Sequence, residues 1–191
     1  QGLTVMRGGT WKGNPDACMS GRRMLSAGYG RDENWGLRAA ITPAPGQKTP
    51  RELTLDLGDG VTMELVYIKP GTFVMGGESK TDGRFQCVEL PKHEVKLTRG
   101  FYLGKYEITQ AQWESAMATR PWAGKSNVEE NPDHPAVYIS WKDVQTFIAR
   151  LNQATGAPTY RLPTAAEWEY ACRAGTTTPW SFGADKNATK K

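Results

Sequence analysis

The side chain best suited to chemistry in this sequence is a thiol set among glycines and arginines. Cys18 lies in the segment RGGTWKGNPDACMSGRR, and Arg22 and Arg23 follow it closely. Cationic neighbours lower the pKa of a thiol and favour the thiolate, which is nucleophilic and binds soft metals. A small buried cysteine in a loop is the simpler interpretation of the same residue.

Other catalytic arrangements find little support. The two histidines, His93 and His134, lie far apart without a companion at metal-ligand spacing, so we predict no metal site built on them. Glu167 and Glu169 could be read as paired carboxylates, but they point to different faces of a helix and Glu167 fits a capping role. No Ser-nucleophile elbow, P-loop or dinucleotide fingerprint occurs.

The cysteine count and the charge exclude several classes. Three cysteines without CxxC spacing argue against a disulfide framework or structural zinc, although one unassigned pair among Cys18, Cys87 and Cys172 stays open. Lys and Arg alternate with Asp and Glu, so the net charge of +4 predicts no nucleic-acid partner. No apolar run reaches membrane-spanning length, and we expect no membrane partner. A soluble protein of cytoplasmic or exported location remains open.

Three helices are predicted from their start signals. Thr109, Ser140 and Thr164 are each followed three residues later by Gln or Asp or Glu, which is the spacing of a capping box. The first two helices are expected over about 110–118 and 141–154, and the third is expected to open at Thr164 and to stop at Gly175. Apolar residues share one face of the middle helix, and we expect Trp113, Trp141 and Trp168 to be buried.

Short strands are predicted around these helices. Residues 53–68 alternate on either side of Gly58-Asp59-Gly60 and predict a hairpin. Further strands are expected within 3–9, 34–40, 71–77 and 93–109. The class is therefore α+β, loop-rich, with short antiparallel strands and about three capped helices. The Pro- and Gly-containing stretch 41–52 has the composition of a linker.

Four motifs occur in order along the second part of the chain: GTFVMGG (71–77), YEITQAQWESAM (106–117), HPAVYISWKDVQTFIARLN (134–152) and RLPTAAEWEYACRAG (161–175). Together they resemble the formylglycine-generating enzyme family, that is, the sulfatase-modifying factor domain with a C-type-lectin-like fold. VMRGGTW and ENWGLRAA, within residues 3–40, resemble the carboxyl-terminal portion of the same family.

The resemblance implies an unusual order. Residues 1–40 look like the carboxyl-terminal portion of such a domain, 41–52 like a linker and 53–191 like the amino-terminal portion. The chain would then be part of a tandem array, or a split or permuted domain completed by another segment or chain. In either case a strand near 73–75 is expected to pair with one near 35–40.

The resemblance also bears on activity. Active members oxidise a cysteine of a sulfatase peptide and hold copper(I) with two cysteines five residues apart. Alignment on Gly8-Gly9 places Cys18 at the second position and Gly13 at the first, with Asn14 and Pro15 replacing a His and an Arg. Copper is therefore expected only if the site is completed elsewhere. Calcium is implied for the intact family fold.

Two functions follow as hypotheses, beside a third interpretation as a purely structural module of a larger multidomain protein. The first is a catalytically degenerate domain whose residues 10–35 bind a protein or peptide, because Trp, Tyr and Arg commonly anchor interfaces. Its candidate binding residues are Trp11, Asn14, Arg22, Arg23, Tyr29 and Trp35. The second is a formylglycine-generating or related metal-dependent oxidoreductase in which Cys18 is the catalytic residue and the rest of the site lies outside this chain.

Overall fold

The structure, a computed structural model, describes residues 35–77, 91–155, 160–178 and 180–184 and the backbone of strands at 4–7 and 23–26. The chain divides into two compact units, described separately below. The first contains Gln1–Ala27, Pro70–Thr98 and Thr164–Lys191, and the second Gly28–Lys69 and Arg99–Pro163. The predicted linker 41–52 lies wholly inside the second unit.

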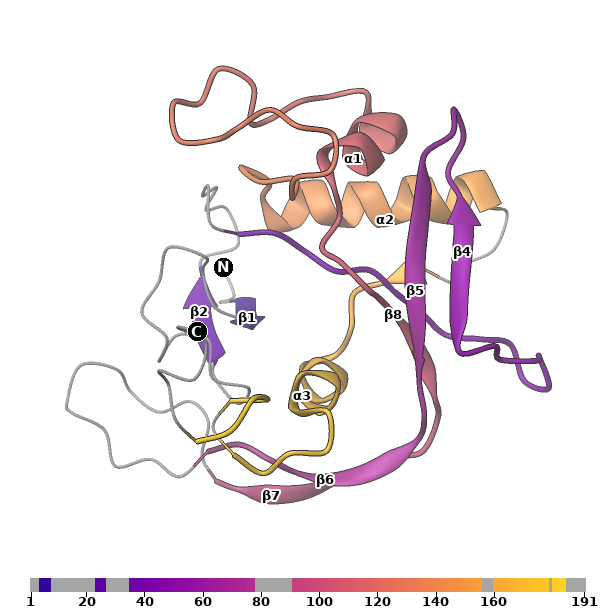
Figure 1. The fold of residues 1–191 in the computed structure, drawn as a ribbon, viewed down its shortest axis with the longest axis vertical. Coiled ribbons are helices and arrows are strands. Elements are labelled where there is room, and N and C mark those ends of the chain that lie inside the picture. Colours follow the sequence, from indigo (N-terminus) through magenta and orange to yellow (C-terminus); the bar gives the residue numbers. More distant parts are fainter. Residues whose placement is uncertain are drawn as a thin grey trace. The chain divides into compact units, whose positions relative to one another are not determined.

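All three predicted helices are present (Figure 1): α1 (Gln110–Met117), α2 (Trp141–Thr155) and α3 (Ala165–Arg173). Each begins where its capping signal predicts. The Thr109 hydroxyl accepts from Gln112 N at 3.2 Å, Ser140 N donates to Asp143 Oδ2 at 2.8 Å, and Thr164 N donates to Glu167 Oε2 at 2.8 Å. These bonds satisfy backbone groups that the first turn of a helix leaves without partners.

The second unit is built on a five-stranded antiparallel sheet in the order β4-β5-β8-β3-β9. Its strands are β3 (Ala40–Ile41), β4 (Glu52–Asp56), β5 (Thr62–Ile68), β8 (Phe101–Gly104) and β9 (Tyr160–Arg161). The predicted hairpin at 53–68 is confirmed as β4–β5. The predicted strand at 34–40 forms only at its end, as β3.

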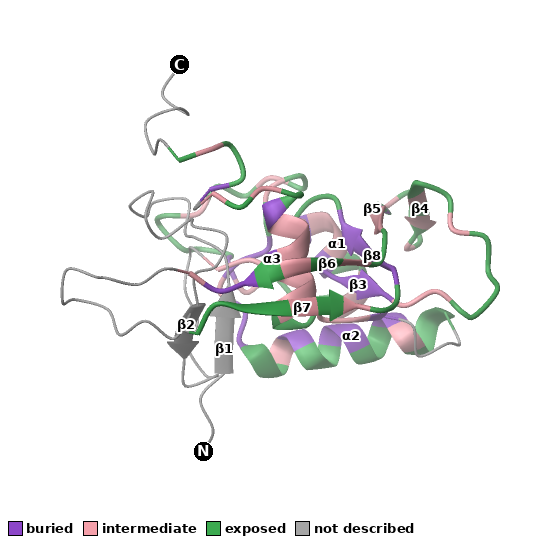
Figure 2. Cartoon of the chain, turned by 90° about the horizontal axis from the view of Figure 1, so that it is seen from below, coloured by how far each residue is buried: buried purple, intermediate pink, exposed green. Residues whose placement is uncertain are grey.

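The core of the second unit lies between the sheet and its two helices, α1 and α2. Met63 and Leu65 of β5 belong to the same buried cluster as Trp113 of α1 and Phe147 of α2. The Trp113 and Phe147 rings stack with centroids 5.1 Å apart. Figure 2 shows buried residues along one side of α2, which is the pattern of an amphipathic helix.

The first unit consists of two antiparallel ribbons and α3. Strand β1 (Thr4–Arg7) pairs with β2 (Arg23–Ser26), and β6 (Gly71–Met75) pairs with β7 (His93–Leu97). Helix α3 contacts β1, β6 and β7. Along β6 the residues that face α3 alternate with exposed ones, as expected for a strand with one buried face.

The predicted class of short antiparallel strands with three capped helices is confirmed. The expected pairing of 73–75 with 35–40 is wrong. Phe73 instead pairs with Val95, and Ala40 lies between Leu103 of β8 and Arg161 of β9. Local sequence signals do not specify which distant strands pair, because each short strand presents similar backbone hydrogen-bonding groups.

Candidate functional site

The candidate binding segment, residues 10–35, is attached to the ribbon formed by β1 and β2. Arg7 and Arg23 are opposite each other in the register, at the end of the ribbon where the intervening residues 8–22 leave and return. Strand β1 also contacts α3 within the same unit. The two ends of this connection are therefore held together by backbone pairing and by a helix, which is how rigid elements commonly position a functional loop.

The last residue of the candidate segment, Trp35, precedes a stretch that is tied to the sheet of the second unit. Ile108 N donates to Leu37 O at 2.8 Å, and Gly104 N donates to Ala39 O at 2.8 Å. Ala39 and Ala40 are fully buried. Trp35 itself is half-buried. The carboxyl-terminal end of the candidate segment is thus fixed by main-chain bonds to β8 and its following loop.

Arg38 adds side-chain bonds at the same place. Its Nη1 donates to Gly104 O at 3.2 Å and to Lys105 O at 2.9 Å. The Glu107 carboxyl packs closely on Gly36, since a Cβ at that glycine would lie 2.9 Å from Glu107 Cδ. Desolvation raises the pKa of Glu107 above its ordinary value, and the positive charge of Arg38 opposes that rise. A side chain at position 36 would therefore displace the flexible end of Glu107.

In the first unit, α3 holds the residues that follow β6. Glu169 is completely buried and its Oε1 accepts from Gly76 N at 2.7 Å. Arg173 donates from Nη2 to Glu169 Oε1 at 2.8 Å and to Gly76 O at 2.8 Å. Both main-chain groups of Gly76 are therefore bound by one ion pair. We call Gly76, Glu169 and Arg173 the α3 clamp.

The α3 clamp was not predicted from the sequence. The sequence suggests only a pairing of Glu169 with Glu167, and the structure confirms Glu167 as a capping residue. The signal that could have revealed the clamp is the spacing of Glu169 and Arg173, because residues four apart on a helix lie side by side. The geometry makes Glu169 a structural group, since burial and pairing leave it away from solvent.

Most predicted site residues lie outside the described part of the chain, and their assignments stay predictions. These are Trp11, Asn14, Cys18, Arg22 and Tyr29; for Arg23 only the backbone is described, in β2. Cys87 also lies outside the described residues. Cys172, expected in the core, is half-buried on α3.

The tryptophan predictions had mixed outcomes. Trp113 is 1% exposed, as expected, and Trp168 is half-buried. The expectation for Trp141 was wrong, because its exposed fraction is 49%. It is the first residue of α2, ahead of the buried stripe that begins at Val144, so its side chain extends past the core.

The resemblance implies a pair of copper-binding cysteines, and whether the site is completed outside this chain stays a prediction. Cys18 is the only cysteine among residues 1–40, and Gly13 offers no side chain at the other position. Copper(I) requires soft ligands, and thiolates supply them. Within the described ranges, no group of three or more His, Cys, Asp or Glu side chains converges as a metal site. No reaction step through copper follows from these donors.

The fold and its motifs match known proteins. Residues 58–191 match the family model of the sulfatase-modifying factor enzyme 1-like domain. The formylglycine-generating enzyme of Bos taurus is 26% identical over 59% of this chain and 40% of its own length. The structure of PvdO from Pseudomonas aeruginosa is 31% identical with a TM-score of 0.58, over 73% of this chain and 57% of that one. The bovine protein named inactive C-alpha-formylglycine-generating enzyme 2 is 27% identical over 71% of this chain and 58% of its own length.

These matches establish the mixed α/β fold of the formylglycine-generating enzyme type. The chain belongs to the sulfatase-modifying factor enzyme 1-like family. It spans about half the length of the curated relatives it matches, between 40% and 58% for the two bovine proteins. None of the helices that the structure describes has the length and apolar character needed to span a bilayer.

Proposed function

We propose that this sulfatase-modifying-factor-type domain is catalytically degenerate and binds a protein or peptide through residues 10–35. The observation that carries the proposal is the pairing of Arg7 with Arg23 in the β1–β2 ribbon. This pairing holds together the two residues between which the connection 8–22 runs. Such an attachment lets a connection vary in sequence while the fold stays intact.

The composition of this segment supports binding. It contains Trp11, Arg22, Arg23, Tyr29 and Trp35, and these residue types most often carry the binding energy of protein interfaces. The residues at the two copper-ligand positions support loss of the family's oxidation chemistry. Gly13 occupies the position where a second thiolate is needed. The relative named as inactive is consistent with a family in which the fold persists without catalysis.

The proposal is tested by selecting ligands from a displayed peptide library and measuring their affinity for variants. Trp11→Ala and Arg23→Ala are each expected to weaken binding about tenfold or more, the effect of losing an interface anchor. Trp141→Ala and Lys96→Ala are matched controls, since both residues are exposed and lie outside 10–35. Equal affinity for the parent chain and both loop variants would refute the proposal.

The second candidate is an oxidoreductase acting on a cysteine-containing peptide, with part of its site outside this chain. The names of the formylglycine-generating relatives favour it. The test is whether the chain converts the thiol of a cysteine-containing peptide to an aldehyde, and mass spectrometry of the peptide measures this conversion. Conversion by the parent chain, with none by Cys18→Ser, would replace the binding proposal with this one.

A further inference from the structure

Among the residues that the structure describes, no strand pairs with the outer edge of the five-stranded sheet. Strand β4 is the first strand in the order of the sheet and pairs with β5 on one side only. Tyr67 N donates to Arg51 O, and Leu57 N donates to Val61 O. Bonding residues alternate along an antiparallel pair, so Glu52, Thr54 and Asp56 direct their N–H and C=O groups away from β5.

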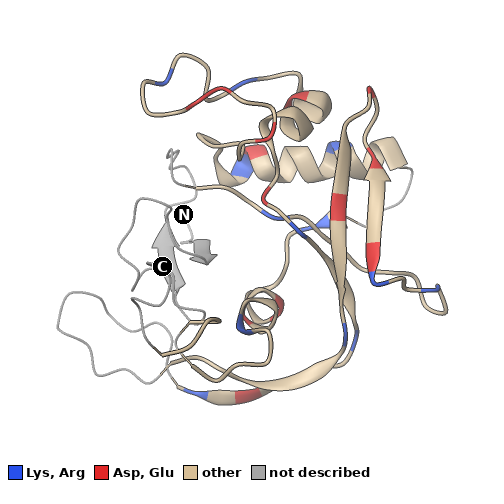
Figure 3. Ribbon diagram, viewed as in Figure 1, with Lys and Arg blue, Asp and Glu red and all other residues tan. Residues whose placement is uncertain are grey.

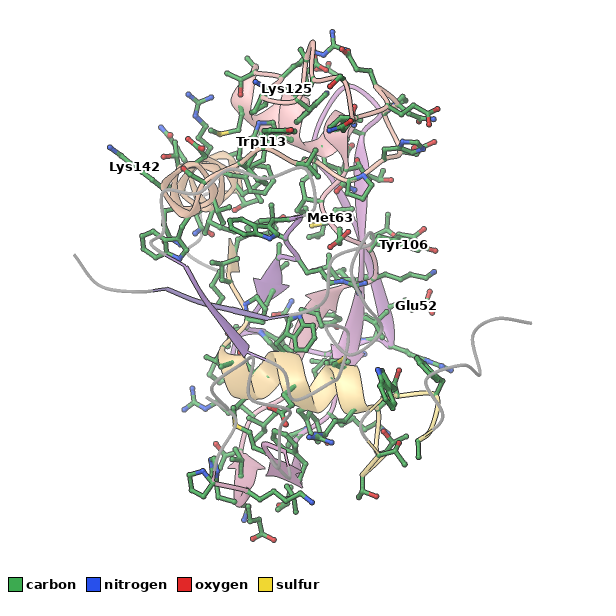
Figure 4. The ribbon with its side chains drawn as sticks, turned by 90° about the vertical axis from the view of Figure 1, so that its left-hand side faces the viewer. Glu52, Met63, Tyr106, Trp113, Lys125 and Lys142 are labelled. Carbon is green, nitrogen blue, oxygen red and sulfur yellow. The ribbon has the colours of Figure 1, made fainter. Side chains whose placement is uncertain are left out.

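The side chains of β4 alternate in the same way. Glu52, Thr54 and Asp56 are exposed, while Leu53 and Leu55 are half-buried and pack against the core of the second unit. Figure 4 shows Glu52 on the outer side of the sheet, away from Met63 and Trp113. An added strand would therefore meet one polar face and one apolar face that is not yet fully covered.

The polar face is acidic in a chain that is basic overall. Residues 51–68 contain one basic residue, Arg51, and four acidic ones, whereas the whole chain has a net charge of +4. Acidic positions mark both β4 and β5 in Figure 3. Lys105 Nζ lies 2.9 Å from Glu64 Oε2 and neutralises that carboxylate. Among the described residues neither Glu52 nor Asp56 forms an ion pair, although Asp56 Oδ1 accepts a hydrogen bond from Gly58 N at 2.9 Å. Both carboxylates can therefore still attract a cationic partner.

We propose that the edge of β4 docks an extended segment of a partner protein as an added strand with alternating basic and aliphatic side chains. Its main chain would bond to Glu52, Thr54 and Asp56, as in other cases of strand addition to a free sheet edge. Basic side chains would lie opposite Glu52 and Asp56. Aliphatic side chains on the other face would cover Leu53 and Leu55.

A second copy of this chain fits the edge poorly. Two β4 strands paired antiparallel about Thr54 would place Glu52 of each copy opposite Asp56 of the other. Like charges directly opposite each other destabilise a strand pair. Opposite charge on the added strand removes this repulsion, so charge complementarity favours a basic partner over self-association.

The first test uses a synthetic peptide in which lysine alternates with valine, with binding followed by fluorescence anisotropy. Thr54→Pro removes an outward N–H without breaking the ladder to β5, and proline is tolerated on edge strands in that orientation. Thr54→Val is the matched control because it keeps both the N–H and the strand preference. The proposal predicts about tenfold or greater weakening in T54P and little change in T54V. Equal binding by parent and T54P would overturn it.

Charge reversal tests the partner chemistry. The double variant E52K/D56K is expected to lose the lysine peptide and to gain a peptide in which glutamate alternates with valine. If the reversal weakens lysine-peptide binding while T54P does not, the interaction is electrostatic adsorption alone, and strand addition is refuted. If E52K/D56K still binds the lysine peptide like the parent, the acidic edge is not the docking site.

Hydrogen exchange of the unmodified chain tests the same geometry without any substitution. In the chain without peptide, the amide hydrogens of Glu52, Thr54 and Asp56 should exchange rapidly with solvent. They should become protected when the lysine peptide is added. Those of Leu53 and Leu55 should be protected in both conditions, because they bond to β5. Protection elsewhere, with the three outward amides unchanged, would overturn the proposal.

Discussion

Glu169 and Arg173, one turn apart on α3, form a buried ion pair in which Oε1 and Nη2 are 2.8 Å apart. The pair binds the N–H and the C=O of Gly76 together. Gly76 follows β6, so the α3 clamp joins α3 to the β6–β7 ribbon beside it. Its cost of desolvation is offset only while both partners remain, because an unpaired buried charge is strongly unfavourable.

Breaking the α3 clamp should destabilise the first unit. Glu169→Gln keeps the size of the side chain but leaves the Arg173 charge buried without an anionic partner. We expect the free energy of unfolding to fall by about 3–5 kcal/mol, the usual cost of losing one member of a buried pair. Urea denaturation measures it, and Glu94→Gln on the exposed face of β7 is the control. Equal stability of the two variants would show that the pair contributes little.

A close contact between Gly71 and Tyr170 gives a second prediction. A Cβ at Gly71 would lie 2.2 Å from Tyr170 Oη and 3.1 Å from its Cζ, and the Tyr170 ring packs on Phe73 with centroids 5.3 Å apart. Gly71→Ala should lower the free energy of unfolding by about 1–3 kcal/mol through overpacking. Adding Tyr170→Phe removes the nearest atom and should restore part of the loss. No rescue in the double variant would contradict this contact.

The raised pKa of Glu107 predicts a pH dependence. Desolvation raises the pKa above 4.5, the ordinary value, so the native state holds this proton more tightly than the unfolded state. Between 4.5 and the higher native pKa, stability should therefore fall as pH rises. Glu107→Gln should remove this dependence, whereas Glu129→Gln, an exposed control in the same unit, should not.

Carboxyl NMR titration measures the Glu107 pKa directly. Arg38→Ala should raise it further, because the guanidinium opposes the effect of desolvation. A pKa at or below 4.5 in the parent chain would contradict the close packing of this carboxyl on Gly36.

The sequence predicted those parts of the fold whose causes are local. Thr109 and Thr164 mark helix starts because a cap and its partner are only three residues apart. The β4–β5 turn was likewise visible in Gly58-Asp59-Gly60. Pairings between distant segments were not visible, so β3 was assigned to the wrong partner, and the short strands β2 and β9 were not predicted.

In the candidate site, too, local features could be predicted from the sequence and contacts between distant residues could not. Helical periodicity assigned Trp141 to the buried face, but only the packing of α2 shows that its first residue extends beyond the core. The α3 clamp depends on Gly76, which is distant in sequence from Glu169 and Arg173. The candidate residues in 10–35 rest on residue type and family resemblance, and they await the binding measurements above.

The amount of copper retained after loading with copper(I) and desalting shows directly whether this family fold lacks the copper pair. We expect equally low copper in the parent chain and in Cys18→Ser, because a single thiolate with glycine at position 13 does not complete the site. Stoichiometric copper in the parent chain that disappears in Cys18→Ser would contradict it.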